Sequence, residues 1–188
     1  LSCFDRNITT IPYKGQVLQN LAIWWFEQTK NICPNHIISV PDPNVMVVKE
    51  CSVIPIEVVV RGYLVGSAWR SYQKSEEISG CKLPKGLKEF SKLEQAILTP
   101  TTKAEVGLHD MPISEEEIYK SKIVKAEIWD QIRTYALSLY SFGVDLLNKR
   151  GLILVDTKYE FGIKDDNVIL VDEIHTLDSS RFWTQDSY

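Results

Sequence analysis

The chain has 188 residues, enough for one good-sized domain or two small ones, and 44% of them are hydrophobic, as in an ordinary globular protein. Its formal net charge of −4 implies no general attraction to nucleic acid, and no apolar run is long enough to span a bilayer. We therefore expect neither nucleic acid nor membrane as a partner.

The four cysteines, Cys3, Cys33, Cys51 and Cys81, are scattered without a CxxC pair or a metal-binding spacing. This usage is typical of reduced thiols in a cytosolic protein, and the sequence has no signal peptide. We therefore expect a cytoplasmic protein without disulfides or zinc.

The first third of the chain predicts two units that meet near Pro55. Proline cannot donate a ladder hydrogen bond, so the start of its strand is expected at a sheet edge or at a crossover between lobes. We place a boundary there, between residues 1–52 and residues 53–188. The elements expected in this part are a helix over residues 16–30 and strands over residues 45–48 and 52–60.

An apolar strand delivers Arg61 at its end, and Gly66 and Ser67 then precede a predicted helix over residues 68–74. A helix N-terminus with a serine cap presents free N–H groups, which suits a phosphate. The alternative is an ordinary N-cap without a ligand. The nearby guanidinium of Arg61 favours the anion site.

The middle of the chain predicts loops followed by a helical scaffold. Residues 75–92 and 98–105 are rich in polar residues, glycine and proline, and Asp110 lies just beyond the second of these loops. Residues 114–117, Ser-Glu-Glu-Glu, form a capping box that opens a long helical region ending before Gly151. Its broad apolar face is typical of scaffold, and we assign it no chemistry.

Residues 152–173 predict two strands joined by a short polar turn, because two runs of Val, Ile and Leu flank Lys-Asp-Asp-Asn. Asp156, Lys158 and Glu160 are two residues apart and should share one face of the first strand. A turn of three or four residues would bring Asp172 opposite Tyr159 or Glu160.

Two interpretations of these charges stay open from the residues alone. They could form the solvated face of an amphipathic hairpin. Alternatively, two carboxylates and a lysine could hold a divalent cation and a phosphorylated substrate, since Mg²⁺ prefers hard oxygen ligands. The continuously apolar runs on both strands favour the second interpretation, because they indicate a hairpin that is covered on both faces.

Asp178 and Arg181 follow the hairpin, separated by two serines. Their charges could pair within a self-contained turn. Alternatively, Arg181 could complete an anion pocket with Arg61 and Ser67. The residues do not decide between these arrangements.

Taken together and in order, these segments resemble the SAICAR synthetase (phosphoribosylaminoimidazole-succinocarboxamide synthase) family. Any one of them would be weak evidence, but their joint occurrence over nearly the whole chain is specific. The matching stretches are residues 11–15 (IPYKG), 55–67 (PIEVVVRGYLVGS), 99–105 (TPTTKAE), 109–110 (HD), 155–162 (VDTKYEFG) and 172–181 (DEIHTLDSSR).

The resemblance implies a two-lobed α+β fold with antiparallel sheets, a long helical region and an ATP cleft between the lobes. In this family the amino-terminal lobe normally supplies a lysine-bearing, glycine-rich strand pair over the ATP phosphates, which is not found in these residues. We therefore expect this lobe to be incomplete here. Because the sequence begins at Leu1, without methionine, and ends on residues 184–188 without a terminal helix, we expect the natural polypeptide to extend beyond both ends.

The activity implied by the resemblance is ATP-dependent ligation of L-aspartate to the carboxylate of a carboxyaminoimidazole ribotide, giving SAICAR, ADP and phosphate in purine biosynthesis. By similarity, Glu160 and Asp172 would serve ATP and its Mg²⁺, and Val53 would lie beside the adenine. Lys158 would steady the transferring phosphoryl group or a substrate carboxylate.

The resemblance also implies the residues that hold the substrates. Arg61, Ser67 and Arg181 would bind the ribotide, chiefly through its 5′-phosphate. The carboxylates expected to orient polar groups of the substrates are Asp110, Asp156 and Asp178, with Asp110 a candidate for the amine, and His109 is a supporting residue. A homo-oligomer is possible. The alternatives are a small-molecule kinase of similar fold and a nucleotide-binding module without turnover.

Overall fold

A computed structural model of the chain describes residues 9–75, 77–103 and 110–188. The helices are α1 (Lys14–Thr29), α2 (Ser67–Ser75), α3 (Glu115–Ser121), α4 (Ala126–Asn148) and the short 3₁₀ helix η1 (Gln185–Ser187). The strands are β1 (Ile37–Asp42), β2 (Val45–Val48), β3 (Ser52–Tyr63), β4 (Glu77–Ile78), β5 (Cys81–Lys82), β6 (Lys92–Leu98), β7 (Thr101–Thr102), β8 (Met111–Pro112), β9 (Leu152–Lys164), β10 (Asn167–Asp172) and β11 (Arg181–Thr184).

Two long antiparallel strands, β3 and β9, form the centre of a seven-stranded sheet. The order along the sheet is β10-β9-β3-β7-β8, with β11 also paired to β9 and β6 also paired to β3. Each central strand thus changes its outer neighbour part-way along its length. β9 pairs with β11 near its start and with β10 near its end, which brings the two chain segments that flank residues 173–180 onto the same strand.

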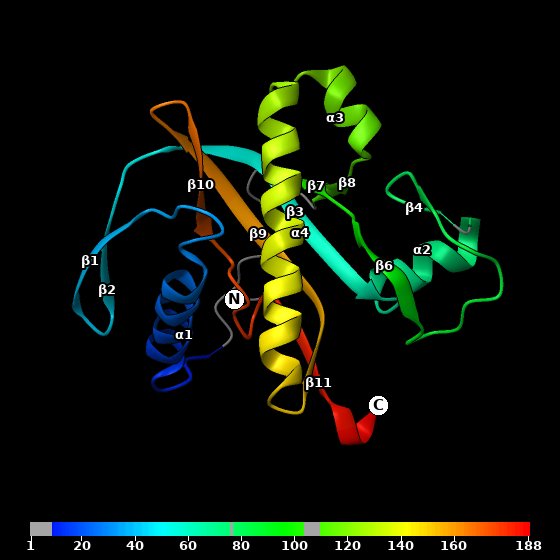
Figure 1. Cartoon of the computed structure of the whole chain (residues 1–188), viewed down its shortest axis with the longest axis horizontal. Coiled ribbons are helices and arrows are strands. Elements are labelled where there is room, and N and C mark those ends of the chain that lie inside the picture. The colour runs from blue at the N-terminus through cyan, green and yellow to red at the C-terminus, as the bar shows by residue number, and fades with distance from the viewer. Residues whose placement is uncertain (1–8, 76, 104–109) are drawn as a thin grey trace.

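Helix α4 crosses one face of this sheet (Figure 1) and supplies much of the main hydrophobic core. Trp129, Ile132, Ala136 and Leu139 are essentially inaccessible to solvent because they pack against apolar residues of the sheet. Burial of a side chain of the size of Ile132 or Leu139 contributes about 1.5–3 kcal/mol to folding. The scaffold role expected for this region is consistent with that packing.

Helix α1 lies toward one end of the molecule with the two-stranded ribbon β1–β2, and α2 lies toward the other end with β4 and β6 (Figure 1). Trp25 and Phe26 of α1 are buried in the main core. The ribbon forms a sheet of its own. The division into residues 1–52 and 53–188 stays a prediction.

The hairpin expected over residues 152–173 is confirmed as β9 and β10. Asp165 and Asp166 form its tight turn with φ values of 50° and 59°, the left-handed conformation that two-residue hairpin turns with the right twist require. Glu160 pairs with Asp172, one of the two expected partners. The turn has two residues rather than the expected three or four, and the pair forms because the register shifts between Leu170 and Asp172.

Other expectations are confirmed with shifted bounds, and some elements were not predicted. Helix 16–30, strand 45–48 and helix 68–74 correspond to α1, β2 and α2, and the strand that begins at Ser52 continues to Tyr63. The helical region after Ser114 is two helices, because Lys122 adopts a left-handed conformation that ends α3. The capping box is present at Ser114. The strands that the pattern did not predict are β1, β4, β5, β6, β7, β8 and β11.

An α+β architecture with antiparallel sheets is thereby confirmed. Over the described ranges, none of the helices is both long enough and apolar enough to cross a membrane.

Candidate active site

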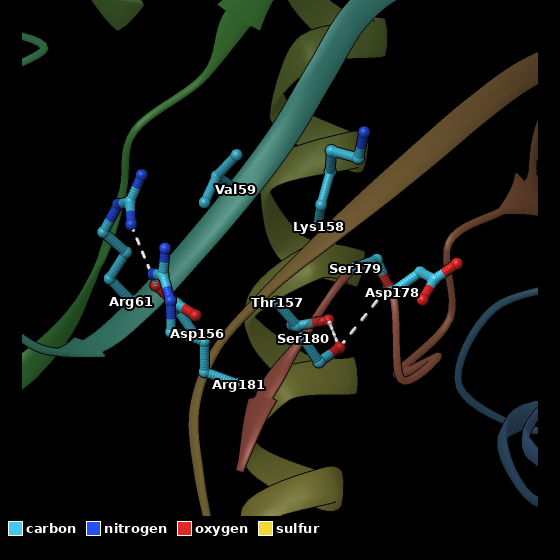
Figure 2. A pocket seen from close by; sticks show the side chains of 9 residues that line it. All are labelled: Val59, Arg61, Asp156, Thr157, Lys158, Asp178, Ser179, Ser180 and Arg181. Carbon is cyan, nitrogen blue, oxygen red and sulfur yellow. Dashed lines mark hydrogen bonds and ion pairs between the residues drawn. The ribbon is translucent and has the colours of Figure 1, made fainter. Parts of the chain in front are cut away.

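A polar pocket of about 240 Å³ opens where β3, β9 and the segment before β11 meet. Figure 2 shows the side chains around it. It brings together five of the residues that the sequence predicts to belong to the site. Its lining residues are Val59, Arg61, Asp156, Thr157, Lys158, Asp178, Ser179, Ser180 and Arg181.

The guanidinium groups of Arg61 and Arg181 converge on the carboxylate of Asp156 (Figure 2). Arg61 Nη1 lies 2.9 Å from Asp156 Oδ2, and Arg181 Nη1 contacts the same oxygen. The Asp156 side chain is 6% exposed, so both cations are held over a buried anion. Two positive charges against one negative charge leave an excess positive charge at the pocket wall, which favours an anionic ligand.

Arg61 is fixed by further contacts that leave it little freedom. Its Nε donates to Thr99 Oγ1 at 2.8 Å, and its Nη2 donates to Ser67 Oγ at 3.2 Å. Burial lowers the pKa of Arg61, while the attraction of Asp156 raises it. An arginine stays protonated in proteins, so this preorganised group offers a fixed positive charge.

Gly66, with φ +62°, leads into α2 and allows the close approach of Arg181. A Cβ at this glycine would lie 2.9 Å from Arg181 Nη2. Ser67 follows and lines a neighbouring polar pocket that shares Arg61 with the first. The structure therefore places Arg61, Ser67 and Arg181 together, and Arg181 pairs with Asp156 rather than with Asp178.

A β-bulge in β9 directs Asp156 toward the pocket. Arg181 is opposite Asp156 and Phe182 is opposite Leu154, so Val155 is an extra residue in β9. Such a bulge changes the face on which the following side chains emerge. Leu154 accordingly belongs to the main core, whereas Asp156 lines the pocket.

Lys158 is held by two carboxylates that were not assigned a role from the sequence. Its Nζ lies 2.8 Å from Glu57 Oε1 and 3.4 Å from Glu173 Oε1. Burial lowers the pKa of Lys158, but the hydrogen bond and attraction of Glu57 outweigh it, and the net pKa is raised. The lysine is therefore a charged group rather than a free amine at neutral pH. A charge inside the apolar run Ile56–Val60 was the signal that could have identified Glu57.

Glu160 lies between two other carboxylates in the sheet register, opposite Glu57 on β3 and opposite Asp172 on β10. It also forms an ion pair with Lys103, at 2.7 Å. Lys103 was not assigned a role from the sequence either. Across the described ranges, no group of three or more His, Cys, Asp or Glu side chains is arranged to hold a metal ion.

Two further expected site residues, Val53 and Asp110, are not among those that line the first pocket. Val53 is 51% exposed and lines a more apolar cavity of about 670 Å³ with Ile54, Pro55 and Ile128. Asp110 is exposed just before β8. Asp178, at the pocket rim, pairs with Lys14 at 2.9 Å. His109 lies outside the described residues.

Comparison with known proteins identifies the family. A sequence model described as SAICAR synthetase matches residues 1–188. The chain belongs to this family. Its SAICAR synthetase relatives include a protein of Agrobacterium fabrum named putative phosphoribosylaminoimidazole-succinocarboxamide synthase 2, which is 52% identical over all of this chain and 61% of that protein. A synthase of Legionella pneumophila strain Paris is 50% identical with the same coverage.

The fold of the SAICAR synthetase family is also found in solved structures. A structure titled SAICAR-synthase from Saccharomyces cerevisiae complexed SAICAR has a TM-score of 0.85 and 34% identity, covering 100% of this chain and 69% of that one. Another, titled SAICAR synthetase (Type-2) in complex with ADP, has a TM-score of 0.80 and 29% identity, covering 95% and 71%. This chain spans about 61% of the length of the two bacterial relatives.

Proposed function

We propose that the protein containing this chain is an ATP-dependent ligase that joins L-aspartate to 5-amino-1-(5-phosphoribosyl)imidazole-4-carboxylate and releases SAICAR, ADP and phosphate. The observation that carries the proposal is the pocket in which Arg61 and Arg181 converge on Asp156 next to Lys158. The names of relatives about 50% identical to the chain support the same reaction. The cytoplasmic location and a homo-oligomer stay predictions.

The ribotide is proposed to bind through its 5′-phosphate at Arg61, Ser67 and Arg181. Guanidinium groups match phosphate geometry with two parallel N–H donors, and the serine hydroxyl adds a donor at the start of α2. The 47% exposed side chain of Arg181 can move to meet a ligand, whereas the 11% exposed side chain of Arg61 is held in place. One arginine thus provides a fixed contact and the other an adjustable one.

ATP is proposed to place its adenine in the cavity beside Val53. Ile54, Pro55 and Ile128 give that cavity an apolar wall suited to an aromatic base. The cavity also includes Ile163 near the end of β9. Because Glu160 and Lys158 precede it on the same strand, a nucleotide lying along β9 would direct its phosphates toward them.

Glu160 and Asp172 are proposed to bind Mg²⁺, because they are paired on neighbouring strands. Paired residues on neighbouring strands put two carboxylates on one part of the hairpin. Mg²⁺ is commonly bound by only one or two protein carboxylates, with phosphate oxygens and water completing its octahedron. The bound cation would neutralise charge that develops on the transferring phosphoryl group.

The reaction needs an activated carboxylate, because a carboxylate itself is a poor electrophile. The ribotide carboxylate attacks the γ-phosphorus of ATP, forming an acyl phosphate and releasing ADP. The aspartate amine then attacks the acyl carbon, loses a proton and expels inorganic phosphate. Lys158 is charged beside Glu57 and is proposed to stabilise the phosphoryl oxygens during the first step.

The carboxylates Asp110, Asp156 and Asp178 are proposed to orient the substrates. Asp156 acts by holding the two arginines. Asp178 lines the pocket and is proposed to bind the ribose. Asp110 is proposed to accept a proton from the aspartate amine. Its side chain is exposed, and an accessible carboxylate suits that task.

An assay of the protein at its full natural length tests this function. ADP release should require both the ribotide and L-aspartate, and the product should be SAICAR. ADP release that ignores aspartate while another acceptor is phosphorylated would instead show a kinase. Binding of ATP without any product would show a nucleotide-binding module.

A further inference from the structure

His175 is a buried histidine that joins four parts of the fold, and the proposed reaction does not use it. Its side chain is fully buried, and its Nε2 lies 2.6 Å from the hydroxyl of Tyr159 on β9. Its ring also meets the edge of Trp25 on α1, with centroids 4.4 Å apart and planes at 88°. The histidine itself belongs to the segment between β10 and β11.

The fourth contact is with Gly143 in the middle of α4. A Cβ at this glycine would lie 2.5 Å from His175 Cε1 and 3.1 Å from Nδ1, closer than real Cβ contacts allow. A glycine inside a helix is unfavourable relative to alanine. Its missing side chain makes the space that the imidazole occupies, so the helix surface is shaped to receive this ring.

The imidazole is held as a neutral group. Burial lowers the pKa of His175 to about 3, and Nδ1 has no hydrogen-bond partner within the described residues. The residue also has φ +48°, a left-handed conformation that is uncommon for residues other than glycine. An unpaired buried ring nitrogen and a left-handed backbone conformation each reduce the stability of the fold, and both occur at His175.

The segment that carries His175 also supplies the pocket. Two residues earlier, Glu173 reaches Lys158, and a few residues later Ser179 and Ser180 line the pocket. Ser180 Oγ also contacts Thr157 Oγ1 of β9, at 2.7 Å. His175 and its neighbour Ile174 are both fully buried, and the ring of His175 meets side chains of α1 and β9 and the space beside Gly143 of α4.

We propose that His175 is a positioning residue that anchors residues 174–180, so that this segment lines the pocket in the geometry the ribotide requires. The identity of the ligand rests on the proposed function. The anchoring of residues 174–180 by His175 does not depend on that function. His175 touches neither substrate nor cofactor and acts through Ser179, Ser180 and Arg181.

Two variants of similar size test the anchor. His175→Gln can place an amide where Nε2 lies and keep the bond to Tyr159, whereas His175→Met fills similar space without that bond. In the full-length protein, His175→Met should raise the KM for the ribotide about tenfold while the kcat changes less than about twofold. His175→Gln should recover most of the affinity. The KM for ATP should not change in either variant.

A substitution in α4 tests the same contact by changing the residue that packs against the imidazole. Gly143→Ala should raise the ribotide KM in the same direction, because its Cβ displaces the imidazole. Ser141→Ala, an exposed change on the same helix, is the matched control and should behave as the wild type. A folded His175→Met protein with wild-type ribotide KM would overturn the proposal. If that variant does not fold, Tyr159→Phe provides the same decision, because it removes the hydrogen bond and keeps the ring.

Hydrogen–deuterium exchange measures the anchoring without any substrate. Amides of residues 174–180 should exchange faster in His175→Met than in the wild type, whereas amides of α4 should not change. Equal exchange in that segment would contradict the anchor even if the enzyme is active. A wild type that does not bind the ribotide in calorimetry would instead refute the proposed function, and the exchange result would still decide the role of His175.

Discussion

The ammonium group of Lys158 lies 2.8 Å from the carboxylate of Glu57, so two residues 101 positions apart in the sequence form one partly buried ion pair between the two central strands of the sheet. The Glu57 side chain is only 10% exposed. Glu57 also accepts a long hydrogen bond from Thr101. The pair connects the proposed phosphoryl-binding lysine to the strand that carries Arg61.

Replacing Glu57 by glutamine should move the alkaline limit of stability to lower pH. The pKa of Lys158 is raised above its ordinary value of 10.5, so the ion pair stabilises the fold below that pH and the stabilisation is lost as pH rises through the folded-state pKa. Without the Glu57 charge, the lysine should lose its proton earlier. Thermal unfolding followed from neutral to alkaline pH measures the shift, and we expect a loss of roughly 1–3 kcal/mol at neutral pH. An unshifted alkaline limit would contradict the pairing.

Lys103 and Mg²⁺ should compete for Glu160, because the Lys103 ammonium already lies 2.7 Å from its carboxylate. Lys103→Met should therefore tighten binding of Mn²⁺, a paramagnetic substitute for Mg²⁺, by a few-fold in the absence of nucleotide. Asp172→Asn should weaken it. Lys88→Met and Asp186→Asn are exposed controls that should leave metal binding unchanged. Titration by electron paramagnetic resonance gives the affinities, and weaker binding in Lys103→Met would count against the competition.

The two arginines on Asp156 should differ in what their removal costs. Arg61→Ala leaves a space beside a buried carboxylate and should destabilise the protein by about 2–4 kcal/mol. Arg181→Ala removes a half-exposed partner and should cost less than about 1 kcal/mol. Both should raise the KM for the ribotide, so Arg181→Ala separates binding from stability. Urea unfolding and initial rates measure the two effects, and equal stability losses would show that Arg61 is not the fixed member of the pair.

The capping box at Ser114 should affect stability without affecting catalysis. Ser114 Oγ accepts a hydrogen bond from the Glu117 amide, and the Glu117 carboxylate accepts one from the Ser114 amide. Ser114→Ala should cost about 1 kcal/mol. The kcat should stay within error of the wild type because this part of the helical region carries no proposed chemistry. A large loss of kcat in a folded protein would show that the region does more than support the sheet.

The hairpin was predictable because its information is local. Alternating side chains, two apolar runs and a polar turn predict that β9 pairs with β10. They leave the register open, because a register shift between Leu170 and Asp172 is what sets Asp172 opposite Glu160. Arg61 and Ser67 were identified for a similar reason. Arg61 lies near the end of β3 and Ser67 begins α2, and the local pattern indicates both positions.

The partners of these residues could not be predicted in the same way. Glu57 and Lys103 meet β9 only because β3 pairs with it, a contact between distant parts of the chain that no local pattern encodes. The bulge at Val155 was hidden as well, since it depends on how β11 docks on β9. Arg181 could have paired with Asp178 nearby in sequence, but the strand pairing of β11 sets it opposite Asp156.

A crystal structure of the full-length protein with Mg²⁺ and a non-hydrolysable ATP analogue would test the central claim most directly. We predict that the carboxylates of Glu160 and Asp172 ligate the metal, with the terminal phosphate within reach of Lys158. Density for the nucleotide elsewhere, or a metal that neither carboxylate approaches, would contradict the account.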